Sequence, residues 1–178
     1  MRIRRATAAD AEALAAVHVR TWQDTYRGQV PQAYLAGLDP AERVPGWRGW
    51  IAEDEAPLGT TVLDHPTGGV IGFVNASASA ADAHDPLLVG EVTALYVLPA
   101  YQGIGGGRAL LADGLDRLFA AGCRHAVLWV LASNERARRY YEAGNWSADG
   151  AHRVDHSRGF PCPEVRYRYT LVAPGPPE

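Results

Sequence analysis

The chain has 178 residues, of which 47% are hydrophobic and 21% are charged, and its formal net charge at pH 7 is −3. These values are typical of one globular domain with a sizeable core, and so small a negative charge argues against nucleic acid or an anionic membrane as the main partner. Cys123 and Cys162 are too few for a disulfide framework and lack the spacing of metal ligands, so we expect inert thiols and no metal site. The chain shows neither a signal-peptide pattern nor a run of about 18 apolar residues, which predicts a cytoplasmic protein.

The first third of the chain predicts one short strand and three helices. Arg2–Arg5 alternates as an edge strand does, and Thr7 is suited to cap a helix that ends near Gly28. Pro31 begins a second, short helix, and Asp39-Pro40 begins a third. The third helix carries one apolar stripe, which we expect to be buried, made of Val44, Trp47, Trp50 and Ile51.

The middle of the chain predicts a hairpin and a further strand. Thr60–Leu63 and Val70–Val74 are β-branched, apolar runs separated by a turn rich in glycine and proline. Asn75–Pro86 is rich in alanine, serine and aspartate, which predicts a strand end followed by a mobile loop. Leu87–Leu98 is the next strand, and a glycine-rich turn and an amphipathic helix that ends at Gly122 follow it.

The last third predicts a strand, a helix and a final strand. His125–Leu131 is an apolar strand, and Ser133 is a natural cap for the helix after it. Arg153–Phe160 has the composition of a polar loop. Pro163–Leu171 alternates in polarity and predicts the last strand.

The most informative stretch is the turn after the strand Leu87–Leu98, with the sequence Gln102-Gly103-Ile104-Gly105-Gly106-Gly107-Arg108. Glycines let a backbone approach a ligand, and the first turn of a helix offers unpaired N–H groups and a partial positive charge, so such a junction is suited to phosphate. A dinucleotide fingerprint has a glycine where Arg108 stands, and a P-loop ends in Gly-Lys-Ser/Thr. Neither class fits, and an ordinary glycine-rich loop is the alternative.

A second motif follows the strand His125–Leu131 and consists of Asn134, Ala137, Tyr140, Tyr141, Glu142 and Trp146. Together with Gln102-x-x-Gly105-x-Gly107 it resembles the paired motifs of the GCN5-related N-acetyltransferase (GNAT) superfamily, bacterial type. The resemblance is firm from Val70 to Trp146. It departs at Asn145, where the family usually has glycine, but asparagine also tolerates a left-handed helix cap.

The resemblance implies an α/β (α+β) GNAT fold, with a single mixed central sheet flanked by helices and a splayed strand pair that holds the cofactor. We expect one domain over residues 1–172 and a disordered tail over 173–178. The implied cofactor is acetyl-CoA, used as a co-substrate, with no metal. The resemblance assigns cofactor contacts to Leu95, Tyr96, Val97, Gln102, Gly103, Ile104, Gly105, Gly106, Gly107, Arg108, Asn134 and Tyr141.

Family members stabilise the oxyanion with a main-chain N–H that a strand bulge leaves unpaired, and the resemblance places this donor at Val97. The transfer also needs a base, because amines are mostly protonated at pH 7, and an acid for the departing thiolate. Glu91 is the candidate base, since its even spacing from Val97 puts both on one face of a regular strand. Other family members carry this glutamate on the following strand, where Trp129 stands here. A surface glutamate is the alternative for Glu91.

The resemblance assigns the acid to Tyr141. The alternative for Tyr141 is a core aromatic residue, a description that suits Tyr140 better. The expected function is acetyl transfer from acetyl-CoA to a primary amine of a small molecule or peptide by direct attack. A non-catalytic acetyl-CoA sensor is the alternative, and a nucleotide-binding domain is disfavoured. By analogy with the family, we expect three parts of the chain to line the acceptor site: the first helices, Asn75–Pro86 and Arg153–Pro163. Their sequences do not identify the acceptor. Homodimer formation is left open.

Overall fold

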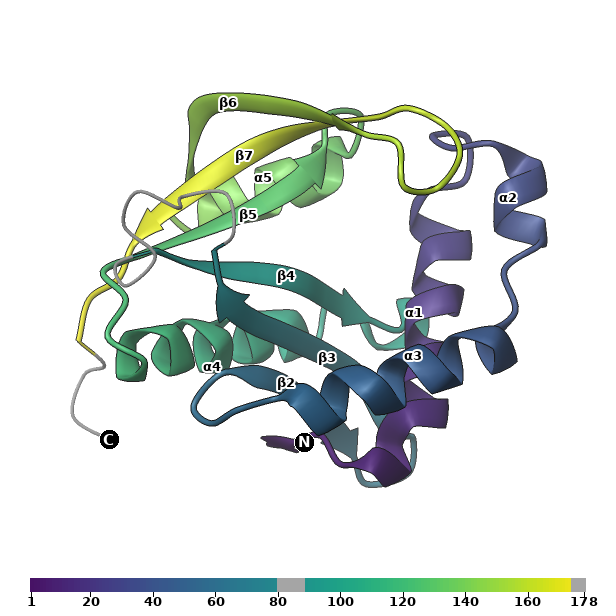
Figure 1. Cartoon of the computed structure of the whole chain (residues 1–178), viewed down its shortest axis with the longest axis horizontal. Helices are drawn as coiled ribbons and strands as arrows, with labels where there is room; N and C mark the ends of the chain where they lie inside the picture. Colours follow the sequence, from purple (N-terminus) through teal and green to yellow (C-terminus); the bar gives the residue numbers. More distant parts are fainter. Residues whose placement is uncertain (80–88, 174–178) are drawn as a thin grey trace.

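A computed structural model describes residues 1–79 and 89–173 of the chain. One sheet runs through the molecule in the order β1-β2-β3-β4-β5-β7-β6 (Figure 1). Only the central pair β4–β5 is parallel, and the other neighbours are antiparallel. The strands are β1 (Arg2–Arg5), β2 (Gly59–His65), β3 (Gly69–Ala78), β4 (Val89–Val97), β5 (His125–Leu131), β6 (Ser147–Asp155) and β7 (Cys162–Thr170). The predicted mixed α/β fold is therefore confirmed.

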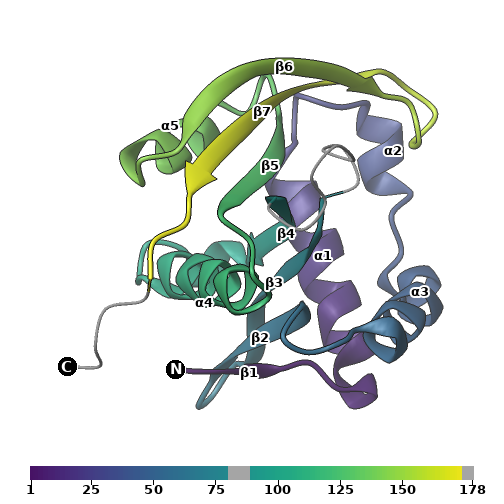
Figure 2. The same ribbon diagram turned by 60° about the vertical axis from the view of Figure 1, so that its left-hand side comes forward.

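Five α-helices and two short 3₁₀ turns connect the described strands. The helices are α1 (Ala11–Thr25), α2 (Gln32–Ala36), α3 (Pro40–Glu53), α4 (Gly106–Ala120) and α5 (Glu135–Ala143), and the turns are η1 (Ala8–Asp10) and η2 (Pro99–Tyr101). Figure 2 shows α4 on one side of the central strands and α1 and α3 on the other. Thr7 stands at the N-cap of η1, and its N–H and hydroxyl donate to Asp10 Oδ2 at 2.8 and 2.9 Å.

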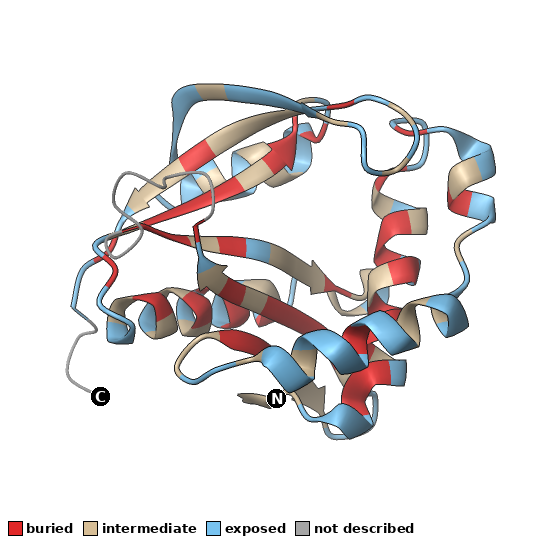
Figure 3. Ribbon diagram, in the orientation of Figure 1, coloured by how far each residue is buried: buried red, intermediate tan, exposed pale blue. Residues whose placement is uncertain are grey.

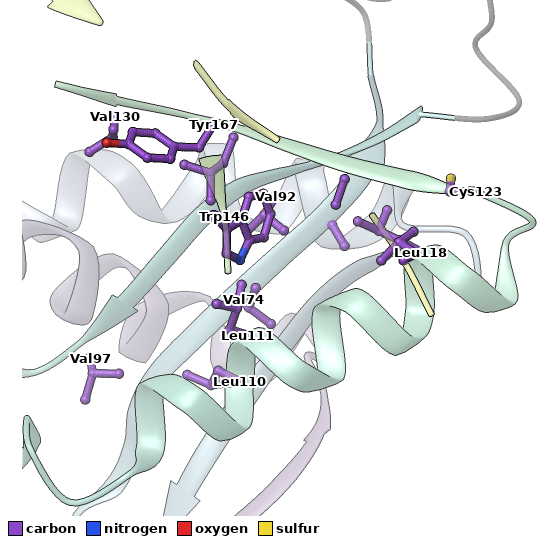
Figure 4. Close-up of a cluster of buried hydrophobic side chains, with 14 of the residues drawn as sticks. Val74, Val92, Val97, Leu110, Leu111, Leu118, Cys123, Val130, Trp146 and Tyr167 are labelled. Atoms are coloured by element: carbon purple, nitrogen blue, oxygen red, sulfur yellow. The ribbon is translucent and has the colours of Figure 1, made fainter. Parts of the chain in front are cut away.

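Each helical layer covers the sheet through an apolar stripe. Leu110, Leu111 and Leu118 of α4 pack on Val74 and Val92, which point toward that helix from β3 and β4 (Figure 4). On the opposite face, Leu14 and Val17 of α1 and Trp47 of α3 pack on Val62 and Phe73. Burial of each such side chain contributes about 1.5–3 kcal/mol, so the two layers hold the sheet between them.

The two central strands separate partway along their length. β4 pairs with β5 only over Val89–Glu91, and the two strands then diverge (Figure 1). A β-bulge accompanies the divergence, because Asn75 faces Ala94 while Ala76 faces Val92, which leaves Thr93 as the extra residue of β4. A bulge bends the strand that carries it, and this bend turns the second half of β4 away from β5.

The structure corrects two predictions about elements. Strand β6 begins at Ser147 and includes part of the segment expected as a polar loop. It is an edge strand with little burial (Figure 3), so its sequence lacks the apolar alternation by which strands are recognised. Trp50 is 56% exposed, whereas Trp47 on the same predicted stripe is 3% exposed, because α1 and the sheet cover only part of α3.

Some predictions fall outside the described residues, namely residues 80–86 of the expected loop, the start of the strand expected at Leu87, and the expected tail from 174 onward. Cys123 and Cys162 are buried free thiols, as predicted. Within residues 1–79 and 89–173, no group of three or more histidine, cysteine or acidic side chains is arranged to hold a metal ion. The helices in this part of the chain are also too short or too polar to cross a membrane.

Candidate active site

A cavity of about 640 Å³ lies where β4 and β5 diverge. Its walls come from the second half of β4, the end of β5, the glycine-rich turn, α5 and one side of α1. The predicted site residues that line it are Glu91, Leu95, Tyr96, Val97, Gln102, Gly103, Gly105, Gly107, Arg108, Asn134 and Tyr141. Ile104 and Gly106 do not: Ile104 is 51% exposed, and a Cβ at Gly106 would lie 2.6 Å from Leu63 on the core side.

The glycine-rich turn depends on backbone conformations that other residues avoid. Gly103 has φ +83° and Gly105 has φ +90°. Gly105 is the N-cap residue of α4. A Cβ at Gly105 would meet no atom within 4 Å, so the space beside this turn is open. The first N–H groups of α4 and the exposed Arg108 lie at this open end, an arrangement of donors and positive charge that suits an anion.

The second half of β4 presents main-chain donors to the cavity. The N–H of Leu98 donates to the carbonyl oxygen of Ile71 at 2.8 Å. Because successive N–H groups of a strand point to opposite sides, the N–H of Val97 points away from β3 and into the gap. The expected bulge at Val97 is wrong, since the bulge lies at Thr93. The donor at Val97 results from the divergence of the strands instead.

The Gln102 side chain joins the turn to this strand. Its Nε2 donates to the carbonyl oxygen of Val97 at 3.0 Å. That carbonyl lies on the same side of β4 as the Val97 N–H, so the amide closes the end of the cavity. The observed contact gives Gln102 a role in shaping the turn.

Glu91 lies on the opposite face of β4 from the one the regular spacing predicts. A Cβ at Gly90 would lie 2.3 Å from Leu118 of α4, so position 90 faces α4 and position 91 faces α1. Val97 packs with the α4 cluster. The same-face prediction for Glu91 and Val97 is wrong because the bulge at Thr93 reverses the alternation of the strand. Glu91 therefore enters the cavity from the side of α1.

Tyr141 stands on α5 with its ring against the core. Its ring centroid lies 5.9 Å from that of Trp146 and 6.2 Å from that of Tyr167. Burial, with smaller contributions from Tyr140 and Tyr96, raises the pKa of the Tyr141 hydroxyl well above its usual value. The hydroxyl is therefore protonated throughout the neutral pH range, as a proton donor must be.

Tyr140 is not the core aromatic residue that the sequence suggested. It is 37% exposed, and its hydroxyl lies 3.8 Å from the position of a Cβ at Gly107. Burial raises the pKa of Tyr140, and the charge of the nearby Arg108 offsets part of this rise. Tyr140 thus borders the glycine-rich turn.

Asn134, and not Ser133, caps α5. The Asn134 Oδ1 accepts a hydrogen bond from the N–H of Ala137 at 3.1 Å, while the Ser133 hydroxyl donates to Gln29 Oε1 at 2.9 Å. Asn134 is only 5% exposed and is also hydrogen-bonded to Tyr26 of the first helical region. This residue therefore connects α5 to the opposite wall of the cavity. At Asn145, the φ of +64° confirms the left-handed cap.

The sequence led us to expect the first helices at the acceptor site, but it singled out no residue of α1 as part of this cavity. Trp22 Nε1 donates to the Tyr96 hydroxyl at 3.0 Å. Thr21 is 4% exposed, and its Oγ1 is buried without a hydrogen-bond partner among the described residues. Both residues line the cavity. Their apolar or small side chains at helical spacing predict core positions equally well, so the sequence alone does not distinguish the two roles.

Comparison with known proteins points to one family. A family model described as "Acetyltransferase (GNAT) family" matches residues 18–144. The N-acetyltransferase YuaI of Bacillus subtilis (strain 168) is 32% identical over 134 residues, which cover 74% of this chain and 72% of YuaI.

Solved structures agree on the fold. The PaiA N-acetyltransferase from Thermoplasma acidophilum, in complex with coenzyme A, superposes with a TM-score of 0.75 at 19% identity, over 95% of this chain and 98% of that one. YncA from Salmonella typhimurium, with its cofactor acetyl-CoA, superposes with a TM-score of 0.69 at 20% identity, over 100% of this chain and 98% of that one.

Proposed function

The chain belongs to the GNAT family of acetyltransferases, and on this premise we propose that it transfers the acetyl group of acetyl-CoA to a primary amine by direct attack. One observation carries the proposal. The glycine-rich turn, the donors and Glu91 of β4, and Tyr141 of α5 come from three segments of the chain and line a single cavity. An anion site, an oxyanion donor, a base and an acid are the groups that this reaction needs.

The cofactor would lie along the gap between β4 and β5. Its pyrophosphate would bind at Gly103–Arg108, where the N-terminus of α4 provides N–H groups and Arg108 a positive charge. Its pantetheine arm would pair with Leu95–Val97 as an added strand, and the side-chain amide of Asn134 would donate a hydrogen bond to it. The N–H of Val97 would then meet the oxyanion, a contribution typically worth a few kcal/mol to the barrier.

Proton transfer would begin at Glu91. The carboxylate accepts a proton from the ammonium form of the acceptor, directly or through water, and the neutral nitrogen attacks the thioester carbonyl. The position of Glu91 on the side of α1 supports this role, because the cofactor occupies the gap in the sheet and the acceptor must approach from another direction.

Collapse of the tetrahedral intermediate breaks the C–S bond, and Tyr141 gives its proton to the departing sulfur. Burial raises the pKa of Tyr141, and the same burial raises the basicity of a thiolate formed beside it. The nitrogen keeps two hydrogens and a positive charge after the attack, and the tyrosinate regains its proton from it, which leaves the neutral amide.

The test is acetylation of an amine panel by the purified protein, followed by release of the coenzyme A thiol with a chromogenic thiol reagent. We expect thiol release that depends on an amine, and none from the Gly105→Glu variant, which places a side chain and a negative charge in the phosphate site. Binding of acetyl-CoA without turnover of any amine would instead support a cofactor sensor and contradict the proposed reaction.

A further inference from the structure

A second cavity of about 350 Å³ lies beside the first, between α1, α2, α3 and the turn that follows β6. Trp22 and Arg158 line both cavities, so the two spaces share a wall. Figures 1 and 2 both show the β6–β7 connection reaching toward α2. Nothing in the proposed transfer step uses this second space.

The second cavity is positively charged. Its charged side chains among the described residues are Arg43 of α3 and Arg158 of the turn after β6, and no aspartate or glutamate of the described chain lines it. Arg158 forms an ion pair with Asp155 just outside the lining. Arg43 donates to the hydroxyl of Tyr34 at 3.4 Å, which is a neutral partner. An anion in this space would therefore meet one guanidinium whose charge no neighbour in the lining balances.

His18 is close enough to both arginines for their charges to affect its pKa. It lies on α1 at the inner wall, stacked on Tyr96 with 5.3 Å between ring centroids. Burial is the main cause that lowers the pKa of His18 to about 4, and the charges of Arg43 and Arg158 contribute to the same shift. Its Nδ1 is buried without a hydrogen-bond partner in the described part of the chain. A neutral imidazole with an unused nitrogen faces the space.

The remaining walls are aromatic. The guanidinium of Arg158 lies 4.7 Å from the ring centroid of Trp22, and Tyr34 forms another side. Trp50 is 56% exposed and rests edge-on against Trp47 at 5.1 Å. The Trp50 indole lines the cavity and is open to solvent, so it is accessible to an apolar group of a ligand.

We propose that this second cavity binds the carboxylate and the apolar side chain of the acceptor, so that the substrate class is small amines that carry a carboxylate, as free α-amino acids do. The inference rests on the proposed acetyl transfer. In an α-amino acid the amine and the carboxylate are two bonds apart. Because Arg158 lines both cavities, a carboxylate bound by Arg43 and Arg158 would have its amine near the wall that the second cavity shares with the cavity of Glu91.

The size of the cavity supports a free amino acid over a peptide. A volume of about 350 Å³ lies at the lower end of the range for small-molecule sites. Guanidinium groups bind carboxylates through paired, charge-assisted hydrogen bonds, which are stronger than neutral ones. The side chain of the acceptor would lie against Trp50, and Trp50→Ala is expected to reduce the preference for large apolar side chains.

The test compares acids with neutral analogues. L-phenylalanine, L-methionine and L-leucine are each assayed beside the corresponding amide and decarboxylated amine. We expect at least one acid to exceed both of its analogues in kcat/KM by about tenfold or more. Arg43→Gln should remove that preference and leave the values for the neutral amines unchanged. The matched control is Arg48→Gln, on the same helix but outside the cavity, where Arg48 pairs with Glu12 at 3.6 Å.

Three results would overturn the inference: acids no better than their analogues, neutral amines acetylated while no acid of the panel is, or Arg43→Gln lowering acids and amides alike. Calorimetric titration of the same acids and amides provides a readout independent of turnover. If the acids bind in an Arg43-dependent manner but no amine is acetylated, the proposed function fails and the site stands. If neutral amines are acetylated without an acid preference, the site fails and the proposed function stands.

Discussion

Replacing Tyr141 with phenylalanine tests the proposed acid with little structural change. The ring contacts with Trp146 and Tyr167 remain, so the free energy of unfolding should change by about 1 kcal/mol or less. Loss of the proton donor should lower kcat by about 10²–10⁴, which corresponds to roughly 3–5 kcal/mol in the barrier. Acetyl-CoA affinity should stay near the wild-type value.

The assay is steady-state thiol release, with acetyl-CoA binding measured separately by calorimetry. Tyr140→Phe is an unsuitable control because Tyr140 borders the glycine-rich turn. Tyr101→Phe is the matched control, since Tyr101 packs against the same core cluster but its ring contacts His65 at a tilt and lies outside the cavity. Because burial raises the pKa of Tyr141, the wild-type rate should show no loss from its ionisation below about pH 10. Near-native turnover of Tyr141→Phe would refute the reasoning.

Three further predictions concern the base, the anion site and the acid stability of the fold. Glu91→Gln should lower the rate most near pH 7 and progressively less as the pH approaches the pKa of the amine, with unchanged acetyl-CoA affinity; an equal loss at every pH from 6 to 10 would exclude Glu91 as the base. Acetyl-CoA at a hundred times its Kd should stabilise the wild type by about 2.7 kcal/mol in a thermal melt, and Gly105→Glu should abolish the shift while the unliganded protein remains folded. The Arg4 hydrogen bond lowers the pKa of Asp10 from 3.8 to about 2, so this carboxylate stabilises the fold above pH 4 and that contribution is lost as the pH falls toward 2. Asp10→Asn should cost about 1–2 kcal/mol in urea unfolding at pH 7 and almost nothing at pH 2; an equal cost at both values would contradict the linkage.

The sequence by itself determined the parts of the site that depend on local backbone conformation. Gly103 and Gly105 adopt the positive φ that their type allows, and Asn145 adopts the left-handed cap that asparagine tolerates best after glycine. These requirements act over a few residues and do not depend on what packs nearby. The strand–turn–helix junction and the family could therefore be predicted from the order of residue types.

Tertiary structure decided how the segments face one another. The bulge at Thr93 arises from the pairing of β3 with β4 and turns Glu91 toward α1, which no count along β4 alone reveals. Trp50 is exposed because of where α3 rests on its neighbours. Arg43 and Arg158 are more than a hundred positions apart and meet at one cavity only because the β6–β7 turn folds over α1. Register, bulges and packing are set by contacts between distant segments, and so they follow from the folded sheet and not from local preference.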